Sequence, residues 1–216
     1  MLKKRKDYIY TCGEEIANAI SHGAIAAVAL LLIPFASARA YVHGGALSVA
    51  GVGIFMVSVF LMLLASTLYH AMARETRHKD VFHILDHIFI FVAIAGTYTP
   101  IALSIISGWQ GIVIVSVQWA MVLFGVLYKS LHPRPIGRVS LSIYLIMGWT
   151  IVFFFPLIWR QASTPLIALI AAGGVFYTAG AFFYALKGFR YHHLVWHLLI
   201  NLAVLCHAVG IIFFLY

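Results

Sequence analysis

Long apolar runs are the feature that most constrains how this chain can fold. A helix needs about 20 residues to cross the hydrocarbon core of a membrane, and it satisfies its own backbone hydrogen bonds there. The sequence contains seven such runs, at roughly 16–38, 46–71, 82–106, 110–129, 138–159, 164–186 and 193–215. Hydrophobic residues make up 63% of the chain and charged residues 9%, which excludes an ordinary soluble domain. We therefore expect an all-α, multi-pass protein of the cell membrane, a bundle of seven transmembrane helices surrounded by the lipid bilayer.

The domain organisation follows from the short links between the runs. The runs account for nearly the whole chain, and we find no internal repeat. We expect one domain over residues 1–216, in which residues 1–15 form a short basic cytoplasmic segment. The basic start resembles a signal peptide, but the first apolar run exceeds the 7–15 residues typical of one. It is better interpreted as the first span.

The net charge of +8 indicates orientation rather than a nucleic-acid partner. Two of the 14 basic side chains, Arg39 and Arg160, fall on one side of the predicted bundle. The others fall on the opposite side: Lys3, Lys4, Arg5, Lys6, Arg74, Arg77, Lys79, Lys129, Arg134, Arg138, Lys187 and Arg190. Short loops rich in Lys and Arg stay in the cytoplasm. We expect a cytoplasmic N-terminus, a C-terminus outside, and no nucleic-acid partner.

Polar side chains inside the runs are informative because lipid makes them costly unless they are paired, hydrated or bound to a metal. Ser66 and His70 lie four residues apart at the end of the second run, on one helical face. His193 and His197 have the same spacing at the start of the seventh run, and Asp86 is the acid placed within the third. Because successive spans alternate in direction, all five are expected at one depth, in the cytoplasmic leaflet.

Three imidazoles from two helices form the ligand set of a catalytic zinc site with one open position. We predict zinc held by His70, His193 and His197. Zinc lowers the pKa of a bound water toward 7. The residues between His193 and His197 are Leu, Val and Trp, so the base must come from elsewhere. Asp86 can take the proton or orient a ligand, and Ser66 can hydrogen-bond the water or a developing oxyanion.

Several other histidines and prolines, and both cysteines, are expected to have structural roles. His78 and His192 are expected in solvated links, and His207 is too deep to share the metal and should hydrogen-bond within the bundle. Cys12 and Cys206 should be too far apart for a disulfide. The prolines expected to kink their spans are Pro34, Pro100 and Pro156.

Together, these motifs resemble the progestin and adipoQ receptor family. The stretches "GEEIANAISHG" and "HLVWHLLINLAVLCH" look most like its bacterial branch, the hemolysin III family, in a superfamily with the alkaline ceramidases. The resemblance covers essentially the whole chain. It implies the same zinc ligands, with Asp86 and Ser66 beside the metal. It also suggests that Glu15, Asn18 and His22 support the site or its entrance. The long amino-terminal domain of the animal receptors has no counterpart here, which argues against hormone sensing.

Three functions remain open on these residues. The first is a zinc-dependent hydrolase of a membrane lipid amide or ester, with a role in lipid homeostasis. The second is a non-enzymatic receptor or regulator of membrane state, in which zinc is structural and the ligand is lipid-like. The third is a haemolysin-like pore, which the absence of a continuous polar stripe disfavours.

Overall fold

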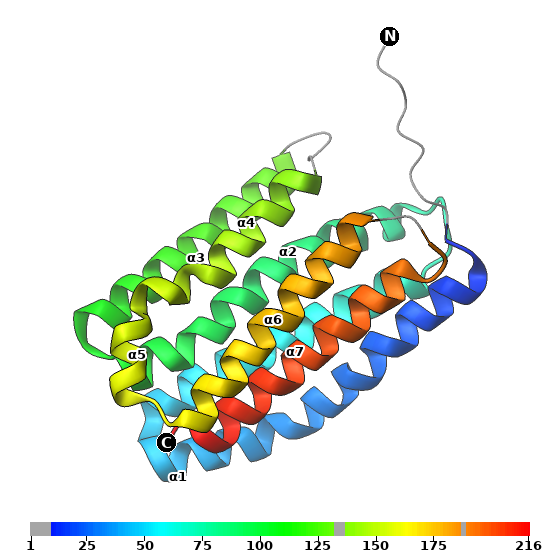
Figure 1. Ribbon diagram of the computed structural model, residues 1–216. Coiled ribbons are helices and arrows are strands. Elements are labelled where there is room, and N and C mark those ends of the chain that lie inside the picture. Colours follow the sequence, from blue (N-terminus) through cyan, green and yellow to red (C-terminus); the bar gives the residue numbers. More distant parts are fainter. Residues whose placement is uncertain (1–9, 132–136, 187–188) are drawn as a thin grey trace.

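The computed structural model describes residues 10–131, 137–186 and 189–216, and in these ranges the chain is helical with no strand (Figure 1). Within the described ranges, six helices are long and apolar enough to cross a membrane. In chain order, the helical segments are α1 (Cys12–Ala71), α2 (Arg77–Ile101), the π-helical turn η1 (Ala102–Ile106), α3 (Gly108–Leu131), α4 (Gly137–Trp149), the 3-10 turn η2 (Thr150–Phe154), α5 (Phe155–Gln161), α6 (Thr164–Leu186) and α7 (His192–Phe214).

Helix α1 folds back on itself at Gly45. At Gly45, φ is 71° and ψ is −164°, a conformation open almost only to glycine. The two arms, residues 12–44 and 46–71, run side by side in Figure 1. Gly23 on the first arm lies so close to the second that an added Cβ would be 3.2 Å from Thr67. The first two predicted runs are therefore the two arms of α1.

The first arm begins beside the start of α7. Thr11 and Glu14 form a capping box, in which the Glu14 backbone amide bonds the Thr11 hydroxyl and the Glu14 carboxylate accepts from the Thr11 backbone amide. The Tyr191 amide also donates to Glu14, at 3.0 Å. This contact brings the first turns of α1 and α7 together. We call this end of the bundle the histidine end.

Two of the three prolines adjoin irregular backbone. Pro100 precedes the π-helical turn η1, and Pro156 follows the 3-10 turn η2 at the start of α5. Tyr98 braces the second irregularity, because its hydroxyl donates to the Gly148 carbonyl at 2.7 Å and accepts from the Ile151 amide at 2.8 Å. Helix α1 continues through Pro34 with helical φ and ψ.

Packing places α1 and α7 at the centre of the main core. The second arm of α1 contributes Phe55 and Leu63, and α7 contributes Ile211, all without exposed surface. Helix α2 lies between α1 and α3, and α4 packs beside α3 on one side of the molecule (Figure 1). Large apolar side chains such as Leu31, Val42 and Phe153 remain exposed on the outside, as expected for a surface that faces lipid.

We predict that Gly45→Ala destabilises the protein by about 1–3 kcal/mol, because alanine resists the positive φ of the turn. No neighbouring atom lies within 4 Å of the added Cβ, so the backbone conformation alone sets the cost. The control is Gly53→Ala, which also has open space for a Cβ but lies in regular helix. It should leave stability unchanged or raise it. Thermal unfolding in detergent measures both, and equal behaviour of the two variants would contradict the assigned turn.

Candidate metal centre

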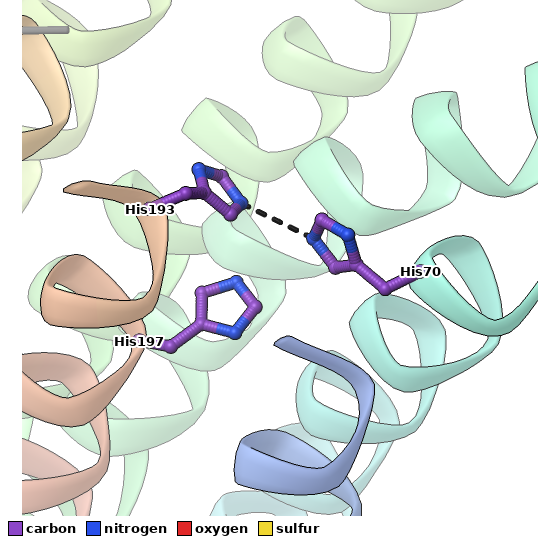
Figure 2. Close-up of side chains that lie close together, drawn as sticks. All are labelled: His70, His193 and His197. Carbon is purple, nitrogen blue, oxygen red and sulfur yellow. Dashed lines mark hydrogen bonds between the residues drawn. The ribbon is translucent and has the colours of Figure 1, made fainter. Parts of the chain in front are cut away.

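His70, His193 and His197 converge at the histidine end, as the sequence predicted. His70 lies in the last turn of α1, and the other two lie one turn apart in the first half of α7. All three are buried, and one ligand nitrogen from each lies within 4.8 Å of the others. Figure 2 shows the rings pointing toward one another, with His70 Nε2 and His193 Nε2 3.1 Å apart. The cluster joins the second arm of α1 to α7.

The free nitrogens of this cluster fit a metal ion. Two nitrogens bound tetrahedrally to zinc at about 2.0–2.1 Å are about 3.3 Å apart, close to the observed His70–His193 separation. His70 Nδ1 donates to Glu15 Oε2 at 2.6 Å, which leaves the Nε2 lone pair free. His197 Nδ1 lies 3.3 Å from the Asn18 carbonyl, and its Nε2 has no hydrogen-bond partner among the described residues. Each of the three histidines can therefore offer one ring nitrogen to a metal that binds imidazole.

The first arm of α1 orients these ligands. Glu15 accepts from His70 and also forms an ion pair with Lys79 at 3.0 Å. Ser21 Oγ lies 3.1 Å from His197 Nδ1, and the His22 ring stacks on the His197 ring with 3.6 Å between centroids. A carboxylate or carbonyl on the second nitrogen fixes the tautomer of a metal-binding histidine. The structure thus places Glu15, Asn18 and His22, suspected from the resemblance, directly beside the ligands.

Tyr10 and His192 cover the cluster from the histidine end. The Tyr10 ring centroid lies 5.1 Å from that of His193 and 6.1 Å from that of His70. Burial raises the pKa of the Tyr10 phenol, which keeps it neutral. The expectation that His192 is solvated is wrong: its ring is buried, and Nδ1 donates to the Phe189 carbonyl at 2.9 Å. Tyr191, with φ of 62°, turns the chain so that α7 begins with His192 inside the bundle.

Asp86 and Ser66 lie beside the histidines. Both are buried, and the Asp86 carboxyl interacts with Ser66, His70 and Lys129. Ser66 Oγ has no hydrogen-bond partner among the described residues, so it can bond a ligand. Asp86, Ser66 and His193 line a cavity of about 1450 Å³ that runs between the helices from the histidine end toward Ile158 and Leu166. This volume exceeds the range of about 300–1,000 Å³ usual for small-molecule pockets.

Several buried polar atoms around the cluster lack a hydrogen-bond partner in the described part of the chain. They include both side-chain polar atoms of Asn18 and both ring nitrogens of His22. Such atoms are costly in an apolar interior, and ordered water or a ligand normally satisfies them. The concentration of these atoms beside the three histidines favours a site that holds water as well as a metal.

His207, His78 and the two cysteines lie where the sequence predicted. His207 lies outside the three-histidine cluster and its Nε2 donates to the Ile170 carbonyl at 3.2 Å, as predicted. His78 is exposed, and both cysteines are free. Sequence reasoning missed Tyr10 and Ser21, which contact the histidines, and Lys79, which forms an ion pair with Glu15 beside them. The four-residue spacing from Asn18 to His22 indicated the helical face near which Ser21 lies. No local sequence pattern predicted the contact of Lys79 with Glu15.

We predict that Glu15→Gln weakens zinc binding about 10–100-fold, because the amide loses the charge that orients His70 and raises its basicity. Competition of the purified protein with a chelator measures the dissociation constant. Glu75→Gln is the matched control, since Glu75 is exposed in the link after α1 and makes the same charge change. Equal zinc affinities of the two variants would show that Glu15 does not support the ligand.

Comparison with known proteins identifies relatives along nearly the whole chain. The model of a family described as haemolysin-III related matches residues 10–208. The hemolysin-3 homolog of Bacillus subtilis (strain 168) is 34% identical over 189 residues, which cover 88% of each chain. Hemolysin-3 of Bacillus cereus is 34% identical over 187 residues, covering 87% of this chain and 85% of that protein. The human monocyte to macrophage differentiation factor, of the progestin and adipoQ receptor family, is 25% identical over 217 residues, covering 97% and 87%. The chain therefore belongs to the haemolysin III family of multi-pass membrane proteins, in agreement with the resemblance drawn from its histidine motifs.

Proposed function

We propose that this protein is a zinc-dependent hydrolase of a membrane lipid amide or ester, with a role in membrane lipid homeostasis. The observation that carries the proposal is that Asp86, Ser66 and His193 share the wall of one large cavity. The same cavity is lined along its length by apolar residues such as Ile94, Ile170 and Ile200. This combination suits a substrate with a hydrocarbon chain and a polar bond near the histidines.

In this proposal His70, His193 and His197 hold the zinc ion. Imidazole binds several transition metals, and zinc is the one that combines three histidines with hydrolytic chemistry at neutral pH. When bound, zinc would supply Lewis acidity that activates a water and polarises the substrate carbonyl. Glu15 and the Asn18 carbonyl would keep the ligand nitrogens aimed at it.

The protein side chains would manage the proton and the developing charge. The Asp86 carboxylate would accept the proton of the attacking water and return it to the leaving amine or alcohol. The Ser66 hydroxyl, which lies near Asp86 and lacks a good hydrogen bond, would donate to the oxyanion that forms from the carbonyl. Both roles need the two groups to face the cavity, as they do.

We predict that Asp86→Asn keeps the metal and lowers turnover about 10²–10⁴-fold, the usual contribution of a general acid or base. Hydrolysis of a panel of labelled amide and ester lipids by purified protein, together with elemental analysis, provides both measurements. Glu75→Gln is the control, because Glu75 is exposed in the link after α1 and does not line the cavity. Full activity of Asp86→Asn would refute Asp86 as the base, and full activity of metal-free protein would refute the dependence on zinc. Absence of any lipid product from native protein would refute the hydrolase.

A structural zinc in a non-enzymatic regulator predicts a different result. The cluster connects α1 to α7, so removal of a ligand would then lower thermal stability, and no lipid product would form with any substrate. Because Asp86 is outside the three-histidine cluster, Asp86→Asn separates the two functions.

We also propose that α1 contributes two spans, giving seven crossings with the N-terminus in the cytoplasm and the C-terminus outside. The break at Gly45 supports two crossings. The orientation is supported by the 14 basic residues, because all but Arg39 and Arg160 belong to the predicted cytoplasmic side. Arg39 donates to the Ile212 and Phe213 carbonyls near the end of α7, so its charge is used within the protein.

The two native cysteines allow a direct test of orientation. Cys12 is exposed at the start of α1, whereas Cys206 is partly buried within α7. A membrane-impermeant maleimide should label Cys12 only after the cells are permeabilised. Cys12→Ser should abolish the labelling, which assigns the signal. Labelling of intact cells at Cys12 would reverse the proposed orientation.

A further inference from the structure

Lys129 is a buried cation that forms no ion pair or hydrogen bond with any described residue. It lies in the last turn of α3, has 6% of its surface exposed, and lines the large cavity. A lysine near the end of a transmembrane helix normally extends its ammonium to the aqueous interface. Lys129 is instead enclosed and borders the cavity. Asp86 attracts its ammonium without forming an ion pair.

Ser140 provides a second unsatisfied polar group on the same wall. It lies in the first turn of α4, is almost completely buried, and its Oγ has no hydrogen-bond partner among the described residues. Helix α4 runs beside α3 (Figure 1), and Gln118 of α3 donates to the Met147 carbonyl of α4 at 3.2 Å. The α3–α4 pair thus presents an ammonium and a hydroxyl to one cavity, and both groups are donors of the kind that an oxyanion accepts.

These two groups are distinct from the metal centre but close to it. Asp86 of α2 interacts with His70 of α1 and with Lys129 of α3, and α2 packs between those two helices. Tyr144, one turn after Ser140, donates to the His87 carbonyl at 2.9 Å and fixes α4 against α2. The α3–α4 groups therefore border the cavity that Asp86 and His193 also line.

The charges around this end favour an anion. The cavity wall carries Asp80 and Asp86 against Lys79 and Lys129, so its formal charges balance. A divalent ion on the histidines would make the sum positive. Lys79 is already bound to Glu15, which leaves Lys129 as the lining cation with capacity for a ligand within the described ranges. Farther along, Ile101, Ile158 and Leu166 form an apolar wall suited to a hydrocarbon tail.

We propose that Lys129 and Ser140 bind the oxyanion head group of an amphiphile whose tail lies along the cavity. The proposal that this amphiphile is also the substrate rests on the hydrolase proposed above, and it narrows the substrate class to anionic lipids. Binding itself does not depend on hydrolysis.

The test is calorimetric binding of dodecyl phosphate to zinc-loaded protein in maltoside micelles. Lys129→Met should weaken binding about tenfold or more, and Ser140→Ala about threefold. Lys129→Arg should stay within about threefold of the native protein, since it keeps the charge. Arg77→Met is the matched control, because Arg77 is exposed and outside the cavity, and it should bind normally. Dodecyltrimethylammonium should bind Lys129→Met no more weakly than native protein.

Several results would overturn this proposal. Unchanged dodecyl phosphate affinity in Lys129→Met would refute it. The same holds if the variant loses only thermal stability, because Lys129 would then only neutralise the charge of Asp86. Binding that survives Lys129→Met but disappears on zinc chelation would assign the anion to the metal. Inorganic phosphate that binds as tightly as dodecyl phosphate would exclude a lipid head group. If Lys129→Met does not fold, equal affinity of native protein for dodecyl phosphate and dodecyltrimethylammonium would also refute it.

The same experiment separates the two proposals. Dodecyl phosphate contains no amide or carboxylic ester, so its binding requires no hydrolytic step. Native protein that binds it through Lys129 but hydrolyses no lipid would refute the hydrolase and keep the anionic subsite. Protein that hydrolyses only uncharged lipids would refute anionic lipids as the substrate class. Unchanged dodecyl phosphate affinity in Lys129→Met, with lipid hydrolysis present, would refute the subsite and keep the hydrolase.

Discussion

A buried imidazole needs partners for both ring nitrogens, and inside a membrane only the protein, an enclosed water or a bound ion can supply them. The metal centre depends on this constraint. His70 has Glu15 on one nitrogen, and His197 has the Asn18 carbonyl and Ser21 on one nitrogen. In both rings the other nitrogen is directed to the shared centre. The first arm of α1 thus serves as a scaffold of acceptors, and its packing against α7 determines where a metal can bind.

Much of this arrangement was predictable because the membrane limits the possible folds so strongly. Each apolar run corresponds to helical structure, and the first two runs meet at Gly45, where the structure turns. The four-residue spacings of Ser66 with His70 and of His193 with His197 give the helical face as well as the depth. Alternating span direction then brings residues more than 100 positions apart to one end of the bundle.

Other features depended on tertiary contacts or single backbone angles that no local pattern reports. His192 looked like part of a basic link, but the left-handed conformation of Tyr191 starts α7 early enough to bury it. Lys129 was counted with the basic residues of the cytoplasmic side, but α3 continues to Leu131 and Lys129 is buried in its last turn. Lys79 reaches Glu15 across the gap between α2 and the first arm of α1, a pairing that neither segment encodes alone.

The hairpin form of α1 also has a consequence for the order of assembly. Glu15 and His70 are only 55 positions apart, on two arms of one folded helix, whereas His193 lies 123 positions beyond His70. Chains fold from the N-terminus as they are synthesised, and contacts close in sequence form first. The Glu15–His70 pair can thus form while the rest of the chain is still being made. The metal centre is completed last, when the final helix brings two histidines to a third whose orientation is already fixed.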